Sequence, residues 1–80
     1  MASDWFTESN IRRAAMMAYD RVQLDPQKFP WFRHGPMTDE KRAKLGDMLH
    51  NICGSCDMTP HLDTIWARIE KLMMTFGEPR

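Results

Sequence analysis

Both cysteines of the chain and two of its three histidines lie in the segment 50–61, which reads HNICGSCDMTPH. Histidine and cysteine sets of four are typical of closed tetrahedral zinc sites, and the candidate ligands here are His50, Cys53, Cys56 and His61. Their order, H-x2-C-x2-C-x4-H, matches no familiar zinc arrangement, in which a CxxC pair is followed by a distant second pair. Zinc is therefore an alternative, and we expect no cofactor.

The same segment contains a CxxC motif, Cys53-Gly-Ser-Cys56, which is also found in redox centres. A lowered thiol pKa in that motif needs the first cysteine at a helix N-terminus. Cys53 falls instead at the C-terminal end of a predicted helix, where the helix dipole opposes the thiolate. We favour a structural interpretation, in which Cys53 borders a buried stripe as a small apolar side chain.

The rest of the sequence contains no recognisable set of catalytic residues. His34 has no serine, cysteine or carboxylate at a local spacing that would activate it as a base. Eighty residues form one modest core and leave little room for an enclosed cleft. We therefore expect a protein that is not an enzyme.

Along most of the chain the apolar residues recur with the spacing of a helix, and neither internal repeats nor strand-like alternation occur. The histidines and cysteines described above must therefore be positioned by helices. The pattern predicts an all-α, single-domain three-helix bundle with helices over about residues 4–24, 38–53 and 60–76 and a loop over 25–37. Capping residues support these bounds: Ser3 or Thr7, Thr38 and Thr59 at the starts, and Pro26, Gly54 and Gly77 at the stops.

Each predicted helix carries an apolar stripe that we expect to be buried. On the first helix the stripe is made mainly of small side chains, which let a neighbouring helix approach closely. The stripes are Ile11, Ala14, Ala15, Ala18 and Val22; Leu45, Met48, Leu49 and Ile52; and Leu62, Ile65, Trp66, Ile69, Leu72, Met73 and Phe76.

A second apolar line runs along the far side of the first helix. It consists of Phe6, Met17 and Leu24, and it passes between Arg13 and Asp20. We expect this line to contact a partner. A second copy of the chain is one candidate, because in an antiparallel two-fold contact each arginine could meet the aspartate of the other copy.

The predicted loop 25–37 combines three of the five prolines with three aromatic rings. Proline fixes φ and restricts the preceding residue, which predicts a stiff, extended connection. Two interpretations stay open. The rings plug an open end of the bundle, which we favour, or some of them are presented to a partner, in which case Trp31, Phe32 and Arg33 would form the contact.

Charge argues against nucleic acid and membrane partners. Eleven basic and eleven acidic residues cancel, so no net field attracts phosphates. The third helix has few basic residues in its first turns, which disfavours a DNA-reading helix. No window of the sequence resembles a membrane span or a secretory signal, so we expect a cytoplasmic protein.

These observations predict a non-enzymatic module that binds another protein or forms a homodimer. Small chains of this kind include inhibitors and adaptors, such as the accessory proteins that phages direct against host machinery. The alternative is a zinc-supported or helix-turn-helix regulator of transcription that binds DNA. The residues predicted to contact a partner are Phe6, Arg13, Met17, Leu24, Trp31, Phe32 and Arg33.

Overall fold

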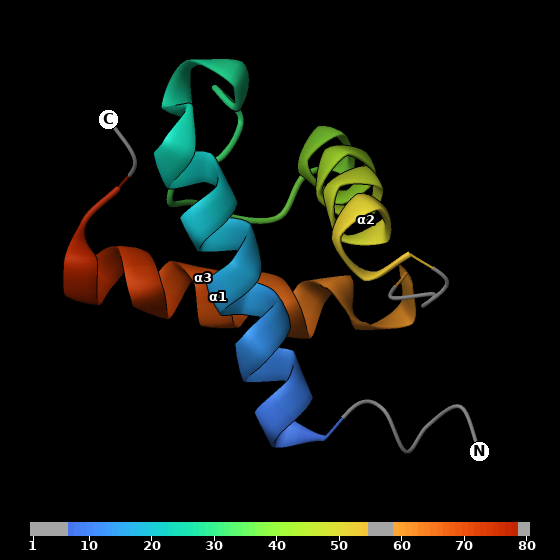
Figure 1. Ribbon diagram of the computed structural model, residues 1–80. Helices are drawn as coiled ribbons and strands as arrows, with labels where there is room; N and C mark the ends of the chain where they lie inside the picture. The colour runs from blue at the N-terminus through green and yellow to red at the C-terminus, as the bar shows by residue number, and fades with distance from the viewer. Residues whose placement is uncertain (1–6, 55–58, 79–80) are drawn as a thin grey trace.

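The computed structural model describes residues 7–54 and 59–78, without the side chain of Cys53, and these residues form an all-α three-helix bundle. The α-helices are α1 (Glu8–Leu24), α2 (Asp39–Cys53) and α3 (Leu62–Phe76), and two short 3-10 helices, η2 (Pro26–Lys28) and η3 (Thr59–His61), precede α2 and α3. Figure 1 shows α1 crossing α3, with α2 beside them. The contact between α1 and α3 is the most extensive in the bundle.

The first helix begins at Glu8, later than the predicted start near residue 4. Thr7 has an extended backbone (φ −79°, ψ 163°), and its Oγ1 accepts a hydrogen bond from the backbone N–H of Asn10 at 3.2 Å. This cap satisfies one of the N–H groups that a helix start leaves without a partner. Ser3, the other predicted cap, lies outside the described residues.

The second helix confirms its predicted start and stop signals. Thr38 Oγ1 accepts a hydrogen bond from the backbone N–H of Lys41 at 3.1 Å. Gly54 has a φ of 85° and donates its N–H to the carbonyl of His50 at 2.7 Å. A positive φ is accessible to glycine at little cost, so Gly54 ends the helix as predicted.

The third helix is shorter at its start than predicted. Thr59–His61 form η3, and the α-helix begins at Leu62, because His61 adopts φ −115° and ψ 10°, outside the α-helical region. The stop at Gly77 is confirmed, with a φ of 96°. The carbonyl of Gly77 also accepts a hydrogen bond from Tyr19 Oη at 2.6 Å, which joins α1 to the end of α3.

The core contains the predicted apolar stripe of α1, which is built mainly of small side chains, and most of the predicted stripes of α2 and α3. The alanines of α1 allow the close contact with α3. The buried core residues from the predicted stripes are Ile11, Ala14, Ala15, Ala18, Val22, Leu45, Met48, Leu49, Leu62, Ile65, Trp66, Ile69 and Met73. Ile52 and Leu72 are partly buried against this core.

One residue of the predicted core lies on the surface. Phe76 was expected on the buried face of α3, but 68% of it is exposed. It is the last residue of α3, beyond the crossing with α1 (Figure 1). The centroid of its ring lies 6.5 Å from that of the Tyr19 ring.

The aromatic loop inserts one ring into the core. Phe32 has an exposed fraction of 0% and packs edge-to-face on Trp66, with 5.6 Å between ring centroids. The ring of Phe32 therefore plugs the bundle, and the alternative in which Phe32 contacts a partner is wrong. Phe29 and Trp31 are partly buried against the core. The loop is also less extended than predicted, because η2 forms a turn at Pro26–Lys28.

Polar contacts from α2 and α3 hold the end of this loop. Trp66 Nε1 donates a hydrogen bond to the carbonyl of Gly35 at 2.9 Å. Lys41 Nζ donates to the carbonyls of Arg33 and Pro36, each at 3.2 Å, and lies 4.9 Å from the centroid of the Trp66 ring. These contacts fix the chain that leads out of Phe32, so the buried ring and the loop support one another.

Within the described ranges, no helix is long and apolar enough to cross a bilayer.

Candidate protein-binding groove

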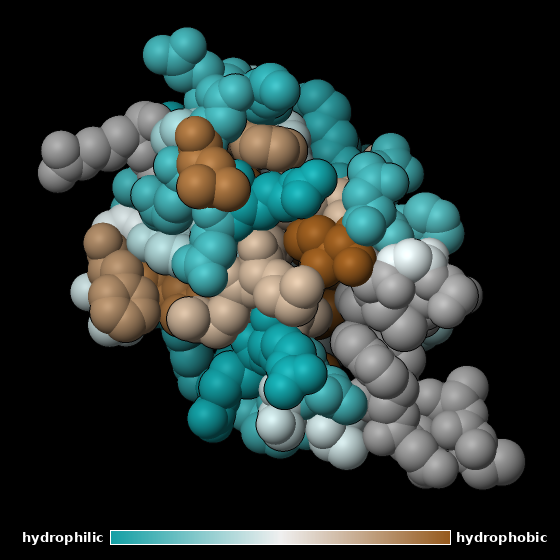
Figure 2. Space-filling view, viewed as in Figure 1, coloured by the Kyte–Doolittle hydropathy of each residue, from teal (hydrophilic) through white to brown (hydrophobic). Residues whose placement is uncertain are grey.

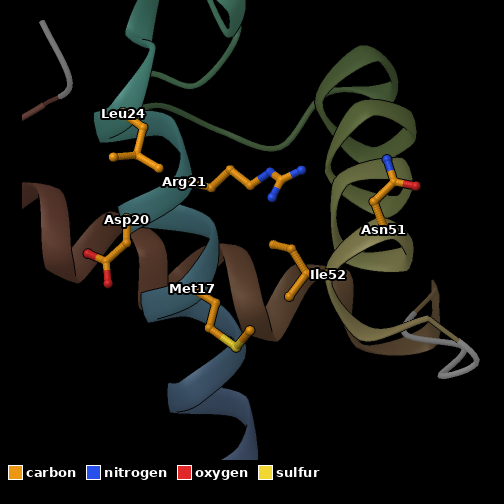
Figure 3. A pocket seen from close by; sticks show the side chains of 6 residues that line it. All are labelled: Met17, Asp20, Arg21, Leu24, Asn51 and Ile52. Atoms are coloured by element: carbon orange, nitrogen blue, oxygen red, sulfur yellow. The ribbon is translucent and has the colours of Figure 1, made fainter.

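An open groove of about 440 Å³ lies between α1 and α2 (Figure 3). Its lining residues are Met17, Asp20, Arg21, Leu24, Asn51 and Ile52. Four of them come from the last two turns of α1 and two from the last turn of α2. The groove therefore exists only because the last two turns of α1 lie beside the last turn of α2.

The packing of α1 explains why the groove is open. Ala14, Ala15 and Ala18 bury one face of α1 against the core, which turns Met17 and Leu24 outward. The contact between α1 and α2 is much smaller than that between α1 and α3, so the two helices do not close over these side chains. Ile52, predicted as core, is only half-buried and contributes apolar surface to the groove.

Two large apolar side chains of the groove are exposed. Leu24 is 87% exposed and Met17 is 43% exposed. Burying one such side chain completely is worth about 1.5 to 3 kcal/mol. Figure 2 shows that hydrophobic surface gathers over the middle of this face, interrupted by polar side chains. This combination is typical of a surface that gains free energy when a partner covers it.

Polar groups border the apolar surface. Figure 3 shows the Arg21 side chain extending from α1 into the space between α1 and α2, while Asp20 points to the other side of α1. Both residues are exposed, as is Asn51 on α2. Apolar contact at the centre with polar groups at the rim is the arrangement that specific protein interfaces use.

The structure brings together only part of the predicted partner-binding set. Met17 and Leu24 both line the groove, next to Asp20. Arg13 is exposed on α1, one turn before Met17, and does not line it. Phe6 lies outside the described residues.

The predicted contact residues of the loop are elsewhere. Trp31 is half-buried, with its ring centroid 5.5 Å from that of Phe32, and Arg33 is exposed beside it. Neither residue lines the groove. The loop therefore does not extend the apolar line of α1, contrary to what a single partner-binding surface would require.

Sequence reasoning missed Arg21, Asn51 and the exposed part of Ile52. Periodicity placed Ile52 on the buried stripe of its helix and did not indicate which end of that stripe α1 would leave uncovered. The two polar residues carried no local signal, because an exposed arginine or asparagine on a helix is ordinary.

The predicted zinc set cannot be assembled from the described residues alone. His50 is exposed and His61 is half-buried, whereas the Cys53 side chain and Cys56 lie outside the described residues. Within the part of the chain that the structure describes, no three histidine, cysteine or acidic side chains are arranged to hold a metal ion. Zinc at the segment 50–61 stays an untested alternative to the expectation of no cofactor.

Comparisons with protein-family models, curated proteins and solved structures found no match to this chain. The groove is therefore interpreted from its own geometry.

Proposed function

We propose that the protein is a non-enzymatic protein–protein interaction module that uses the groove between α1 and α2 as its docking surface. The observation that carries this proposal is the exposure of Leu24 and Met17 beside the half-buried Ile52. These three side chains come from two helices and form one apolar surface with a polar rim.

The shape of the groove favours an apolar segment of a partner, such as one face of a helix. A helix that docks in a groove inserts side chains spaced three or four residues apart. Leu24 and Met17 lie two turns apart on α1 and would contact successive side chains of such a segment. Arg21, between them, would pair with a polar or acidic group of the partner, which adds specificity.

A module of this kind acts by occupying a surface of its partner. It needs neither a cofactor nor a catalytic group, and it suits an inhibitor or an adaptor.

Site-specific photocrosslinking in the organism that encodes the chain tests this proposal. A photoreactive residue at position 24 should crosslink one discrete protein, and the same residue at Lys44, exposed on α2 and outside the groove, should not. Met17→Asp should remove the crosslink at position 24. The purified partner should then bind the wild type and lose affinity for Met17→Asp. Equal crosslinking at positions 24 and 44 would refute the groove as the docking surface.

A homodimer is a second candidate, favoured by the charges along the same side of α1. Arg13 and Asp20 are exposed on either side of Met17 and lie seven residues apart. In an antiparallel contact centred near Met17, each Arg13 would meet Asp20 of the other copy, and the two methionines would pack together.

Sedimentation at micromolar concentration distinguishes a second copy from a foreign partner. If the chain pairs with itself, the wild type should sediment as a dimer, and Arg13→Asp should dissociate it. Adding Asp20→Arg to that variant should restore the dimer, because the charges are then exchanged. A wild type that sediments as a monomer rules out this candidate and leaves the foreign partner.

A further inference from the structure

A second hollow, of about 140 Å³, lies between α1 and α3. It is lined by Arg12, Ala15, Met16, Arg68, Lys71 and Leu72. It shares no residue with the lining of the groove, because it is formed with α3 and the groove with α2.

Three cationic side chains surround this hollow, although the whole chain has no net charge. Glu8 pairs with Arg68 and offsets one of them. Among the described residues, neither Arg12 nor Lys71 forms an ion pair, and both are exposed. The rim of the hollow therefore keeps a local excess of positive charge.

The close contact of α1 and α3 concentrates these charges. Ala15 is almost completely buried where the two helices meet, which draws the helix axes together. Long side chains at the edges of that contact, Arg12 on α1 and Lys71 on α3, then flank the same space. Lys71 lies three residues after Arg68, and residues at that spacing share one side of a helix.

The floor of the hollow is apolar. It consists of Ala15, the half-buried Leu72 and Met16, which is 38% exposed. A methionine adapts its shape to different apolar groups because its side chain is unbranched and flexible. A hollow of about 140 Å³ suits a single aliphatic side chain.

We propose that this hollow binds an acidic segment of another protein, in which one aliphatic side chain is flanked by carboxylates. The aliphatic side chain would enter the hollow and contact Met16 and Leu72. The carboxylates would meet Arg12 and Lys71 at the rim, where arginine can bind a carboxylate through two parallel hydrogen bonds.

The lining argues for a carboxylate-bearing protein segment rather than a nucleic acid. Proteins that hold single strands combine a basic groove with aromatic rings on which bases stack. Among the residues that the structure describes, no aromatic ring lines this hollow, and its cations form a compact cluster instead of a stripe that follows a phosphate backbone. This inference concerns a surface separate from the groove and does not depend on the function proposed for it.

Fluorescence anisotropy with the full chain tests the inference. The probe is a short fluorescein-labelled peptide with one leucine between pairs of glutamates. The double charge reversal Arg12→Glu/Lys71→Glu should weaken its binding about tenfold, as expected for several exposed charge pairs that each contribute modestly. The matched control is Lys28→Glu/Lys44→Glu, which makes the same charge change at exposed positions outside the hollow and should weaken binding by less than about threefold.

Further arms separate the alternatives. A peptide with serine in place of leucine should bind more weakly, and higher salt should weaken all binding because it screens exposed charges. If the double reversal fails to fold, the milder variant Arg12→Gln/Lys71→Gln takes its place. Its loss of peptide affinity should be smaller than about tenfold but larger than that of the control. Met17→Asp should leave peptide binding unchanged, so that failure of the groove and failure of the hollow give different results.

Three outcomes would overturn the inference. The first is an equal loss of peptide affinity in the double reversal and in its control. The second is equal affinity for the leucine and serine peptides. The third is tighter binding of an oligonucleotide than of a peptide with the same charge.

Discussion

The two most closely packed helices of the bundle use their apolar residues in different ways. Most of the large side chains of α3 are buried, and they include Ile65, Trp66 and Ile69. α1 buries three alanines, together with Ile11, Tyr19 and Val22, while Met17 and Leu24 remain exposed. Both helices are amphipathic, but the core contribution of α3 comes from large residues, whereas half of the buried residues of α1 are alanines that allow close contact between the helices.

This difference separates stability from recognition. Free energy gained by burial scales with the apolar area removed from water, so α3 contributes more to the folded state than α1 does. The exposed residues of α1 contribute little to folding and border both the groove and the cationic hollow. The predictions below test this division, from the largest expected effect to the smallest.

Phe32→Ala should be the most destabilising change, because it removes a fully buried ring from its contact with Trp66. We expect a loss of about 3 to 5 kcal/mol in the free energy of unfolding, measured by urea denaturation. Leu24→Ala, which also removes a large apolar side chain, is the control and should cost under about 0.5 kcal/mol. Similar losses for the two variants would show that Phe32 is not in the core.

Ile69→Ala tests the contribution of α3 directly. Ile69 is fully buried, and the cavity left behind should cost about 2 to 5 kcal/mol by the same measurement. Met17→Ala on α1 should cost much less, because Met17 is already 43% exposed. A loss below about half a kilocalorie for Ile69→Ala would contradict the assignment of α3 as the main source of core burial.

Ala18→Leu tests whether the small face of α1 is required for contact with α3. Ala18 has no exposed surface, and a larger side chain there should force the helices apart at a cost of about 1 to 3 kcal/mol. Ala43→Leu makes the same change at an exposed position on α2 and should be nearly neutral. Thermal unfolding followed by circular dichroism measures both, and an unchanged midpoint for Ala18→Leu would refute the close contact.

Leu24→Ser should have the smallest effect on stability. The side chain is 87% exposed, so the free energy of unfolding should change by no more than about 0.5 kcal/mol. Binding of the protein partner should nevertheless weaken, because the groove loses much of its apolar surface. A variant that unfolds more easily but binds normally would reverse the roles assigned to the two helices.

The sequence by itself determined the helical class, the end of α1, the bounds of α2 and the stop of α3. These features depend on residues that act locally: a threonine whose hydroxyl caps the first turn of α2, Pro26 just after α1, and a glycine that adopts a positive φ after the last turn of α2 and of α3. The buried stripes were predictable for a related reason. Periodicity reports which residues share one side of a helix, and a wide apolar side must be covered.

Only the tertiary structure decided which apolar residues stay uncovered. Of the two interpretations that the sequence left open for the loop, the structure shows the buried one for Phe32, whereas Phe76 is exposed although periodicity placed it on the buried side of α3. The groove and the cationic hollow also required the crossing of the helices to be known, because each draws its residues from two of them. Periodicity defines directions around one helix axis but carries no information about where along that axis a neighbouring helix crosses or ends.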